Sequence, residues 1–185
     1  MRINSVVLII VSVATLACSP AASRSPVAQA QAAETAPTPP PSSKKQASVE
    51  MVSYTNGRFG FSVQRPKNFK PLRSPDNGGG QAFAGPGGAE LRVWGSYNSL
   101  DQTVEQAYSE AKATRARSGE VTYAAQKDNW YVLSGFEGDG VFYEKFILAD
   151  GQITGLEMTY PRSKKATYDP IVGRVAKSLT PPRGE

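Results

Sequence analysis

The sequence contains no histidine and only one cysteine in 185 residues. Histidine is the commonest general base and the commonest transition-metal ligand, so Ser-His-Asp and Cys-His catalytic mechanisms are excluded. One cysteine can form neither a disulfide within the chain nor a cysteine-ligated zinc site. We therefore expect no metal, no cofactor and no catalytic residue of these classes, and the composition favours a non-enzymatic binding module.

The sequence also lacks a basic stripe, although its net charge is +5. Lysine and arginine are scattered along the chain and mixed with acidic residues. A dedicated nucleic-acid-binding protein usually gathers its basic residues on one face or along one helix. We therefore expect no nucleic-acid partner.

The chain begins with a basic residue and a short apolar run, which is typical of a secretory signal peptide. Val6–Ala17 holds twelve residues without a charge, after Arg2. As a helix, twelve residues rise only about 18 Å, whereas a bilayer core is about 30 Å thick. The segment is too short for a permanent span, so we expect residues 1–17 to be removed.

The single cysteine follows that run, in the stretch TLACSP (residues 15–20). This stretch resembles the lipobox of bacterial lipoproteins, although Leu16 stands directly before Ala17 and the usual leucine position holds Thr15. The resemblance implies a diacylglyceryl group on the Cys18 thiol and cleavage before it. It also implies a lipid anchor in the cell envelope, facing the periplasm or exterior, on the outer membrane if the organism has one. The alternative is an ordinary secreted protein with an incidental cysteine.

Residues 18–50 form a linker rich in alanine, proline and serine, without leucine, isoleucine or aromatic residues after Cys18. Such a segment cannot bury enough apolar surface to offset the entropy of folding. We expect a disordered tether between the lipidated Cys18 and a domain over residues 51–182. A proline-rich ligand for a partner domain is the alternative.

From residue 51 onward, alternating apolar residues and turn residues predict a series of strands. We expect them at residues 59–63, 81–84, 90–97, 120–126, 130–136, 141–149 and 152–160. Short glycine- and aspartate-containing links between the last four strands indicate antiparallel neighbours. In residues 130–136, the residues that point to either face of the predicted strand are largely apolar. This predicts a central strand covered on both faces.

Two helices complete the predicted domain. Ser99 and Gln102 suggest a capping box, followed by one apolar stripe and a stop at Gly119; the stripe holds Val104, Ala107, Tyr108 and Ala111. Asp169 before Pro170 suggests the start of the second helix, unless an earlier turn over residues 163–168 extends it. Its buried stripe holds Ile171, Val172, Val175 and Leu179.

This order predicts an α+β domain in which an antiparallel sheet carries helices on both faces. The phrases YTNGRFGFSVQRP and YDPIVGRVAKSL, at its start and end, resemble the PsbP-like fold. An extrinsic subunit of the oxygen-evolving photosystem and a Ran-binding nuclear import factor share that fold. The resemblance covers about residues 51–180 and implies an α/β/α sandwich used for binding or assembly. It assigns no functional residue.

Several residue groups could carry chemistry, and each has a simpler explanation. Glu137–Gly140 offers oxygens to calcium but lacks the ligand spacing of an EF-hand, which favours a hairpin turn. The glycine-rich stretches 76–80 and 85–88 lack the lysine of a phosphate-binding loop, which favours mobile loops. Arg162, Lys164 and Lys165 could contact phospholipid, but a solvated helix start explains them.

Three strand glutamates, Glu90, Glu144 and Glu157, could converge and hydrolyse a glycosidic bond without histidine. Arg92 and Trp94 share a strand face with Glu90 and could form a contact patch. We favour a plain core position under a helix for Trp94.

The leading functional hypothesis is an envelope lipoprotein whose domain binds or helps to assemble another envelope protein. A small-ligand or cell-wall binding module is the alternative, and a carboxylate-dependent hydrolase is the third. Beyond Cys18, the sequence names no binding residue.

Overall fold

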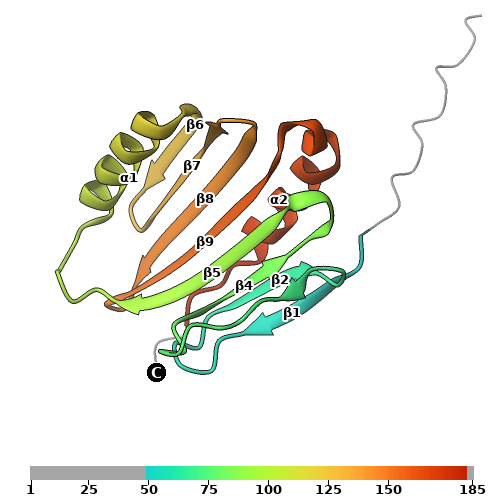
Figure 1. Ribbon diagram of the computed structural model, residues 1–185. Coiled ribbons are helices and arrows are strands. Elements are labelled where there is room, and N and C mark those ends of the chain that lie inside the picture. The colour runs from blue at the N-terminus through green and yellow to red at the C-terminus, as the bar shows by residue number, and fades with distance from the viewer. Residues whose placement is uncertain (1–48, 183–185) are drawn as a thin grey trace, which may run out of the picture. The chain divides into compact units, whose positions relative to one another are not determined.

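The computed structural model describes residues 49–182, which contain a large antiparallel sheet, a separate strand pair and two helices (Figure 1). The predicted signal peptide, the lipidation site at Cys18 and nearly all of the predicted tether lie outside the described residues. The predicted fold class is confirmed, because one helix packs on each face of the antiparallel sheet.

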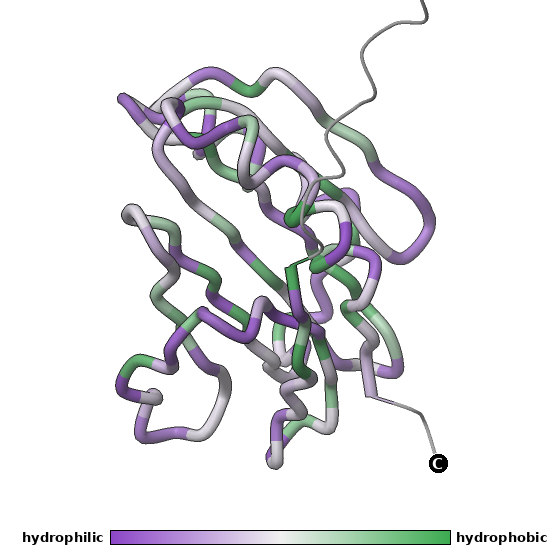
Figure 2. Tube along the Cα trace, turned by 90° about the vertical axis from the view of Figure 1, so that its right-hand side faces the viewer, coloured by the Kyte–Doolittle hydropathy of each residue, from purple (hydrophilic) through white to green (hydrophobic). Residues whose placement is uncertain are grey.

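The large sheet has seven strands in the order β3-β4-β5-β9-β8-β7-β6. Six of the predicted strands are confirmed to within one residue at either end. The strand bounds are β3 Lys70–Pro71, β4 Gly80–Ala84, β5 Glu90–Tyr97, β6 Glu120–Lys127, β7 Trp130–Glu137, β8 Gly140–Ala149 and β9 Gln152–Pro161. Figure 2 shows hydrophobic and hydrophilic residues alternating along these strands, as expected for a sheet whose two faces differ.

The first predicted strand was placed too early. The structure pairs β1 (Met51–Thr55) with β2 (Ser62–Pro66), and residues 59–61 belong to the turn between them. The Asn56 side chain makes that turn, because its Oδ1 accepts the backbone N–H groups of Arg58 and Phe59 at 3.0 and 2.7 Å. Gly60 adopts the left-handed φ of +68° that the turn requires.

The first helix, α1, spans Val104–Ser118, and its N-cap lies four residues after the predicted one. The capping box uses Thr103 and Gln106 instead of Ser99 and Gln102. Asn98 explains the shift, because its side chain bonds both backbone groups of Gln102 and holds the preceding residues in a loop. The predicted apolar stripe does face the sheet.

The second helix, α2, spans Lys165–Ser178, so the N-cap prediction at Asp169 was wrong and the earlier turn exists. Pro170 lies inside the helix at the cost of one backbone hydrogen bond. Tyr168 explains the early start, because it is buried against Phe69 and Tyr160 and its hydroxyl donates to the carbonyl of Pro86. Asp169 accepts a hydrogen bond from the Tyr160 hydroxyl at 2.8 Å.

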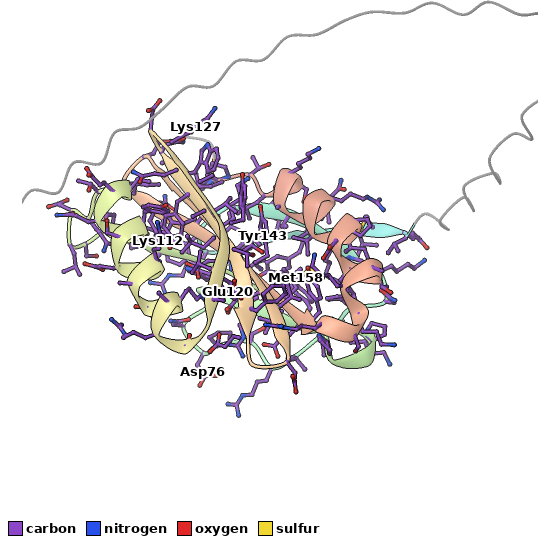
Figure 3. The ribbon with its side chains drawn as sticks, turned by 90° about the horizontal axis from the view of Figure 1, so that it is seen from above. Asp76, Lys112, Glu120, Lys127, Tyr143 and Met158 are labelled. Carbon is purple, nitrogen blue, oxygen red and sulfur yellow. The ribbon has the colours of Figure 1, made fainter. Side chains whose placement is uncertain are left out.

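The two helices cover different parts of the sheet, on opposite sides of it (Figure 3). The α2 helix and the β1–β2 pair bury one face into the main core, around Phe61, Leu91 and Met158. The α1 helix covers the opposite face over β6, β7 and β8, above Leu133, Phe142 and Phe146, and reaches β9 at Ile153. The strand β7 has buried residues on both faces, Val132 on one and Leu133 on the other, but it lies second from the sheet edge and is not central.

Candidate functional site in the uncovered half of the sheet

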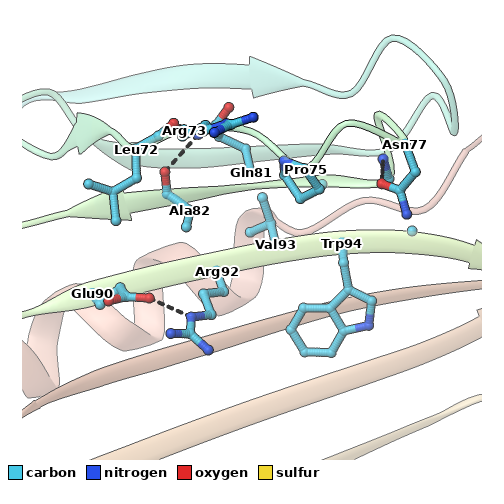
Figure 4. Close-up of a pocket in the computed structure, with 13 residues that line it drawn as sticks. Leu72, Arg73, Pro75, Asn77, Gln81, Ala82, Glu90, Arg92, Val93 and Trp94 are labelled. Carbon is cyan, nitrogen blue, oxygen red and sulfur yellow. Dashed lines mark hydrogen bonds and ion pairs between the residues drawn. The ribbon is translucent and has the colours of Figure 1, made fainter.

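The strands β4 and β5 have no helix over the face on which α1 packs elsewhere. Along β5, Leu91 and Val93 point into the main core and are almost fully buried. Glu90, Arg92 and Trp94 alternate with them and therefore project from the uncovered face. A cavity of about 660 Å³ lies along this face, and Figure 4 shows the side chains that line it. We call it the β4–β5 groove.

Small residues form the floor of the β4–β5 groove. In the register of the two strands, Gly80 pairs with Trp94 and Ala82 pairs with Arg92. Neither β4 residue carries a side chain longer than a methyl group, so the space between the two walls stays empty. Any β-branched or aromatic residue at position 82 would fill it.

The loop between β3 and β4 forms the second wall, with Leu72, Arg73, Pro75 and Asn77. Leu72 is 44% exposed and lines the groove. Hydrogen bonds fix this wall at both ends. The Gln81 amide donates to the Leu72 carbonyl at 2.6 Å, and the side chains of Asn56 and Arg58 donate to the carbonyls of Gly78 and Asn77.

Trp94 forms the wall on the β5 side, and the core position favoured from the sequence is wrong. Its side chain is half-buried and belongs to neither core cluster. The indole lies against Gly155 of β9, where a Cβ atom would stand only 2.3 Å from the ring. Because α1 packs at the β6–β8 end of the sheet, it leaves this aromatic ring uncovered. The contact-patch alternative is the better description.

Arg92 and Glu90 form an ion pair at one end of the groove, through the Arg92 Nε atom. The hydrogen bond to Glu90 is the main reason why the pKa of Arg92 lies above its usual value. The Arg92 side chain is nevertheless 62% exposed, whereas the Glu90 side chain is 30% exposed. The guanidinium is therefore the more accessible charge of the pair.

Glu144 and Glu157 do converge, because they are directly paired on β8 and β9 beneath α1. Arg115 of α1 bonds both carboxylates, at 2.8 Å to Glu144 and 2.5 Å to Glu157. Burial opposes the Arg115 charge, but the bonds to the two glutamates outweigh it and raise the pKa of Arg115. Tyr131 donates to Glu144 at 2.7 Å, and burial together with that carboxylate raises the pKa of Tyr131.

This arrangement is an ion-pair network, and its geometry does not support the carboxylate hydrolase. A glycosidase needs one carboxyl group that carries a proton and a second that faces the scissile bond. Here the Arg115 guanidinium occupies the space between Glu144 and Glu157, and Glu90 is bonded to a different arginine. Within residues 49–182, no group of three or more acidic or cysteine side chains is placed to hold a metal ion.

The other sequence candidates take structural roles. Gly138 and Asp139 form the hairpin turn between β7 and β8, as favoured from the sequence. Residues 85–88 make a tight turn between β4 and β5, whereas residues 76–79 belong to the tethered groove wall and Gly80 begins β4 at the floor of the groove. Arg162 stacks on the Phe136 ring at 3.8 Å, and Lys165 pairs with Asp169 within α2.

Sequence reasoning missed one wall of the groove. Leu72, Arg73 and Pro75 lie between two predicted strands and follow no period, so they appeared as ordinary loop residues. The phrase YTNGRFGF did contain a signal. Its Asn56 is a buried polar residue that ties the β1–β2 turn to the loop wall.

Comparisons with known proteins support the fold and assign no function, partner or binding residue. No family model matches the chain, and no curated protein matches it. Solved structures similar to this chain include the following two. Cyanobacterial PsbP (CyanoP) from Synechocystis sp. PCC 6803 has a TM-score of 0.53 at 14% identity, over 76% of this chain and 97% of that chain. A mutant of the protein Mog1 has a TM-score of 0.52 at 8% identity, over 71% and 95%.

The chain has a PsbP-like fold. The expected resemblance is confirmed at the level of architecture. Identities of 14% and 8% transfer no binding residue and no activity, because one fold hosts many functions. The groove has to be interpreted from its own chemistry.

Proposed function

We propose that this protein is a lipid-anchored envelope lipoprotein whose PsbP-like domain binds a segment of another envelope protein. The observation that carries the proposal is the β4–β5 groove, which has the half-buried indole of Trp94 on one wall and a tethered loop with Leu72 and Pro75 on the other. Exposed aromatic and arginine side chains are the residues that most often dominate binding energy at protein interfaces.

The shape of the groove favours a chain segment over a small molecule. Small-molecule sites bury about 70–90% of the ligand surface, usually in a closed pocket. The β4–β5 groove has a floor and two walls, but no helix lies above it. A ligand-binding function remains the second candidate, because the cavity volume of about 660 Å³ falls within the range of about 300–1,000 Å³ typical of such sites.

The anchor in this proposal rests on the sequence alone. Cys18, with its lipobox-like surroundings, would carry two or three acyl chains, and two chains suffice for stable membrane attachment. Among the described residues no helix is both long and apolar enough to span a bilayer. The tether of residues 18–50 would hold the domain near the membrane surface, where an envelope partner is accessible.

A cross-linked pull-down from detergent-solubilised membranes of the native host tests the proposal. We expect wild type to recover one envelope protein in near-stoichiometric amount. Cys18→Ala should leave the membrane fraction and lose that protein. Ala82→Leu should stay in the membrane fraction and lose it too, because the leucine fills the groove.

Recovery of the partner by Ala82→Leu at the wild-type level would reject the groove as the binding site. Wild type alone in the membrane fraction would reject protein binding and favour the small-ligand alternative. Unchanged membrane attachment of Cys18→Ala would reject the lipid anchor.

A further inference from the structure

We propose that the β4–β5 groove selects an extended acidic segment, with an apolar side chain against Trp94 and a carboxylate on Arg92. This inference rests on the proposed function, since it specifies the chemistry of the bound segment. Three features of the groove carry it: the accessible charge, the spacing of Arg92 and Trp94, and the neutralised carboxylates nearby.

The accessible charge of the groove is positive. One arginine belongs to each wall, Arg73 in the loop and Arg92 in β5, with side chains 88% and 62% exposed. Arg92 uses only its Nε atom in the pair with Glu90, and its two Nη groups have no hydrogen-bond partner within residues 49–182. Those N–H groups form the fork that receives a carboxylate in a bidentate contact.

The two acidic residues at the rim do not cancel this charge. Glu90 is less exposed than Arg92 and is already bonded to it. Asp76 is 3.6 Å from Arg73 in a fully solvated pair, and exposed pairs of this kind contribute about 0–1 kcal/mol. An incoming carboxylate can therefore replace Asp76 at little cost.

The carboxylates of the neighbouring strands are also neutralised. Glu157 lies directly opposite Arg92 in the sheet and would otherwise repel an acidic segment. It is bonded to Arg115, together with Glu144, and its side chain is only 18% exposed. Glu144 and Glu157 thus direct their carboxylates to Arg115 of α1. The charge of Glu157 nevertheless contributes, after that of Glu90, to the raised pKa of Arg92.

The spacing along β5 defines the pattern of the segment. Arg92 and Trp94 are two residues apart on the same strand face, which separates their Cα atoms by about 6.6 Å. An extended segment running along β5 presents its own side chains at the same interval. We therefore expect a carboxylate two residues away from a large apolar side chain.

Fluorescence anisotropy with short labelled peptides and the full-length protein in detergent tests this pattern. The probe is an amidated nonapeptide containing Glu-Ser-Leu-Ser-Glu, and its controls replace both glutamates with glutamine or with lysine. A fourth peptide, which has glutamines and a free C-terminal carboxylate, distinguishes a terminal carboxylate from a side-chain carboxylate. We expect the glutamate peptide to bind at least tenfold more tightly than the lysine peptide, with an affinity that falls as salt rises.

Variants locate the effect within the groove. Arg92→Gln should reduce binding of the glutamate peptide to the level of the glutamine peptide, whereas Arg117→Gln, on the exposed surface of α1, should change nothing. Trp94→Ala and Ala82→Leu should abolish binding of every peptide. Circular dichroism confirms that each variant is folded.

Equal or tighter binding of the lysine peptide would overturn the inference, as would absence of binding by all four peptides. An unchanged preference for glutamate in Arg92→Gln would overturn it too. The proposed function is tested separately, by the pull-down. A partner that is recovered from membranes with wild type and lost with Ala82→Leu supports groove binding, whatever the peptides show.

Discussion

The two helices of this domain pack on opposite faces of one sheet and are held there by different interactions. The α2 helix buries five side chains, from Tyr168 to Ala176, in the main apolar core. The α1 helix is one residue longer but buries only Val104 and Ala107. The C-terminal half of α1 is attached through Arg115, which bonds Glu137, Glu144 and Glu157.

The difference shows where the fold leaves room for function. Over β4, β5 and β9 the face under α2 is closed by the helix and by the β1–β2 pair, so the residues there serve stability. The face under α1 is covered from β6 to β8 and left open over β4 and β5. A binding site can therefore vary on the α1 face without disturbing the main core.

The largest expected difference between the two helices is in the cost of truncating a buried side chain. Ile171→Ala on α2 should lower the free energy of unfolding by about 2–5 kcal/mol. Val104→Ala on α1 removes two buried carbons and should cost about 1–2 kcal/mol. Urea denaturation measures both values, and a larger loss for Val104→Ala would contradict the comparison.

Removal of the Arg115 guanidinium should be the most damaging single change on the α1 side. Arg115→Gln leaves Glu144 and Glu157 paired face to face without a cation, and we expect a loss of about 2–3 kcal/mol. The double variant with Glu157→Gln should recover more than half of that loss, because the repulsion is removed. Equal stability of the single and double variants would show that charge does not hold α1.

The hydrogen bonds of Asn56 connect the closed core to the groove wall. Asn56→Ala leaves the N–H groups of Arg58 and Phe59 unpaired and releases the Gly78 carbonyl. We expect the free energy of unfolding to fall by about 1–3 kcal/mol. Partner binding should weaken as well, since the loop wall loses its tether. A stability loss without a binding loss would show that the wall is fixed by other contacts.

The ionisation of one buried tyrosine on each face of the sheet allows the two faces to be compared at alkaline pH. The pKa values of Tyr131 on the α1 face and Tyr160 on the α2 face are both raised, chiefly by burial. Above about pH 10 the unfolded chain loses these protons while the folded chain keeps them, so stability falls as pH rises. Each Tyr→Phe variant should flatten that fall by up to about 1.4 kcal/mol per pH unit. Urea melts from pH 8 to 11 measure the slopes, and unchanged slopes would refute the buried positions.

The smallest expected effect on stability belongs to the groove itself. Arg92→Gln should change the free energy of unfolding by less than about 0.5 kcal/mol, because its ion pair with Glu90 is exposed. A loss above 1 kcal/mol, measured by the same denaturation, would assign Arg92 a structural role and weaken its place in the binding site.

Sequence periodicity predicted the strands and their faces well, but it could not predict which part of a face a helix covers. The alternation of Leu91 and Val93 with Arg92 and Trp94 was correct, and yet Trp94 was placed under a helix. The alternation of apolar and polar residues shows which way the side chains of one strand point. Whether a helix covers those side chains depends on where α1 packs, several strands away.

The early start of α2, left open from the sequence, depends on a tertiary contact too, the burial of Tyr168. The start of α1 was misplaced for a local reason, the hydrogen bonds between Asn98 and Gln102.

Site-specific photo-cross-linking in the native host tests the central claim most directly. A benzoylphenylalanine replaces Leu72 on the groove wall or, as the matched control, Leu100, which is 90% exposed outside the groove. Our account predicts one adduct of defined mass from position 72, its loss in Ala82→Leu, and no adduct from position 100. Equal adducts from both positions, or an adduct from position 72 that survives Ala82→Leu, would contradict it.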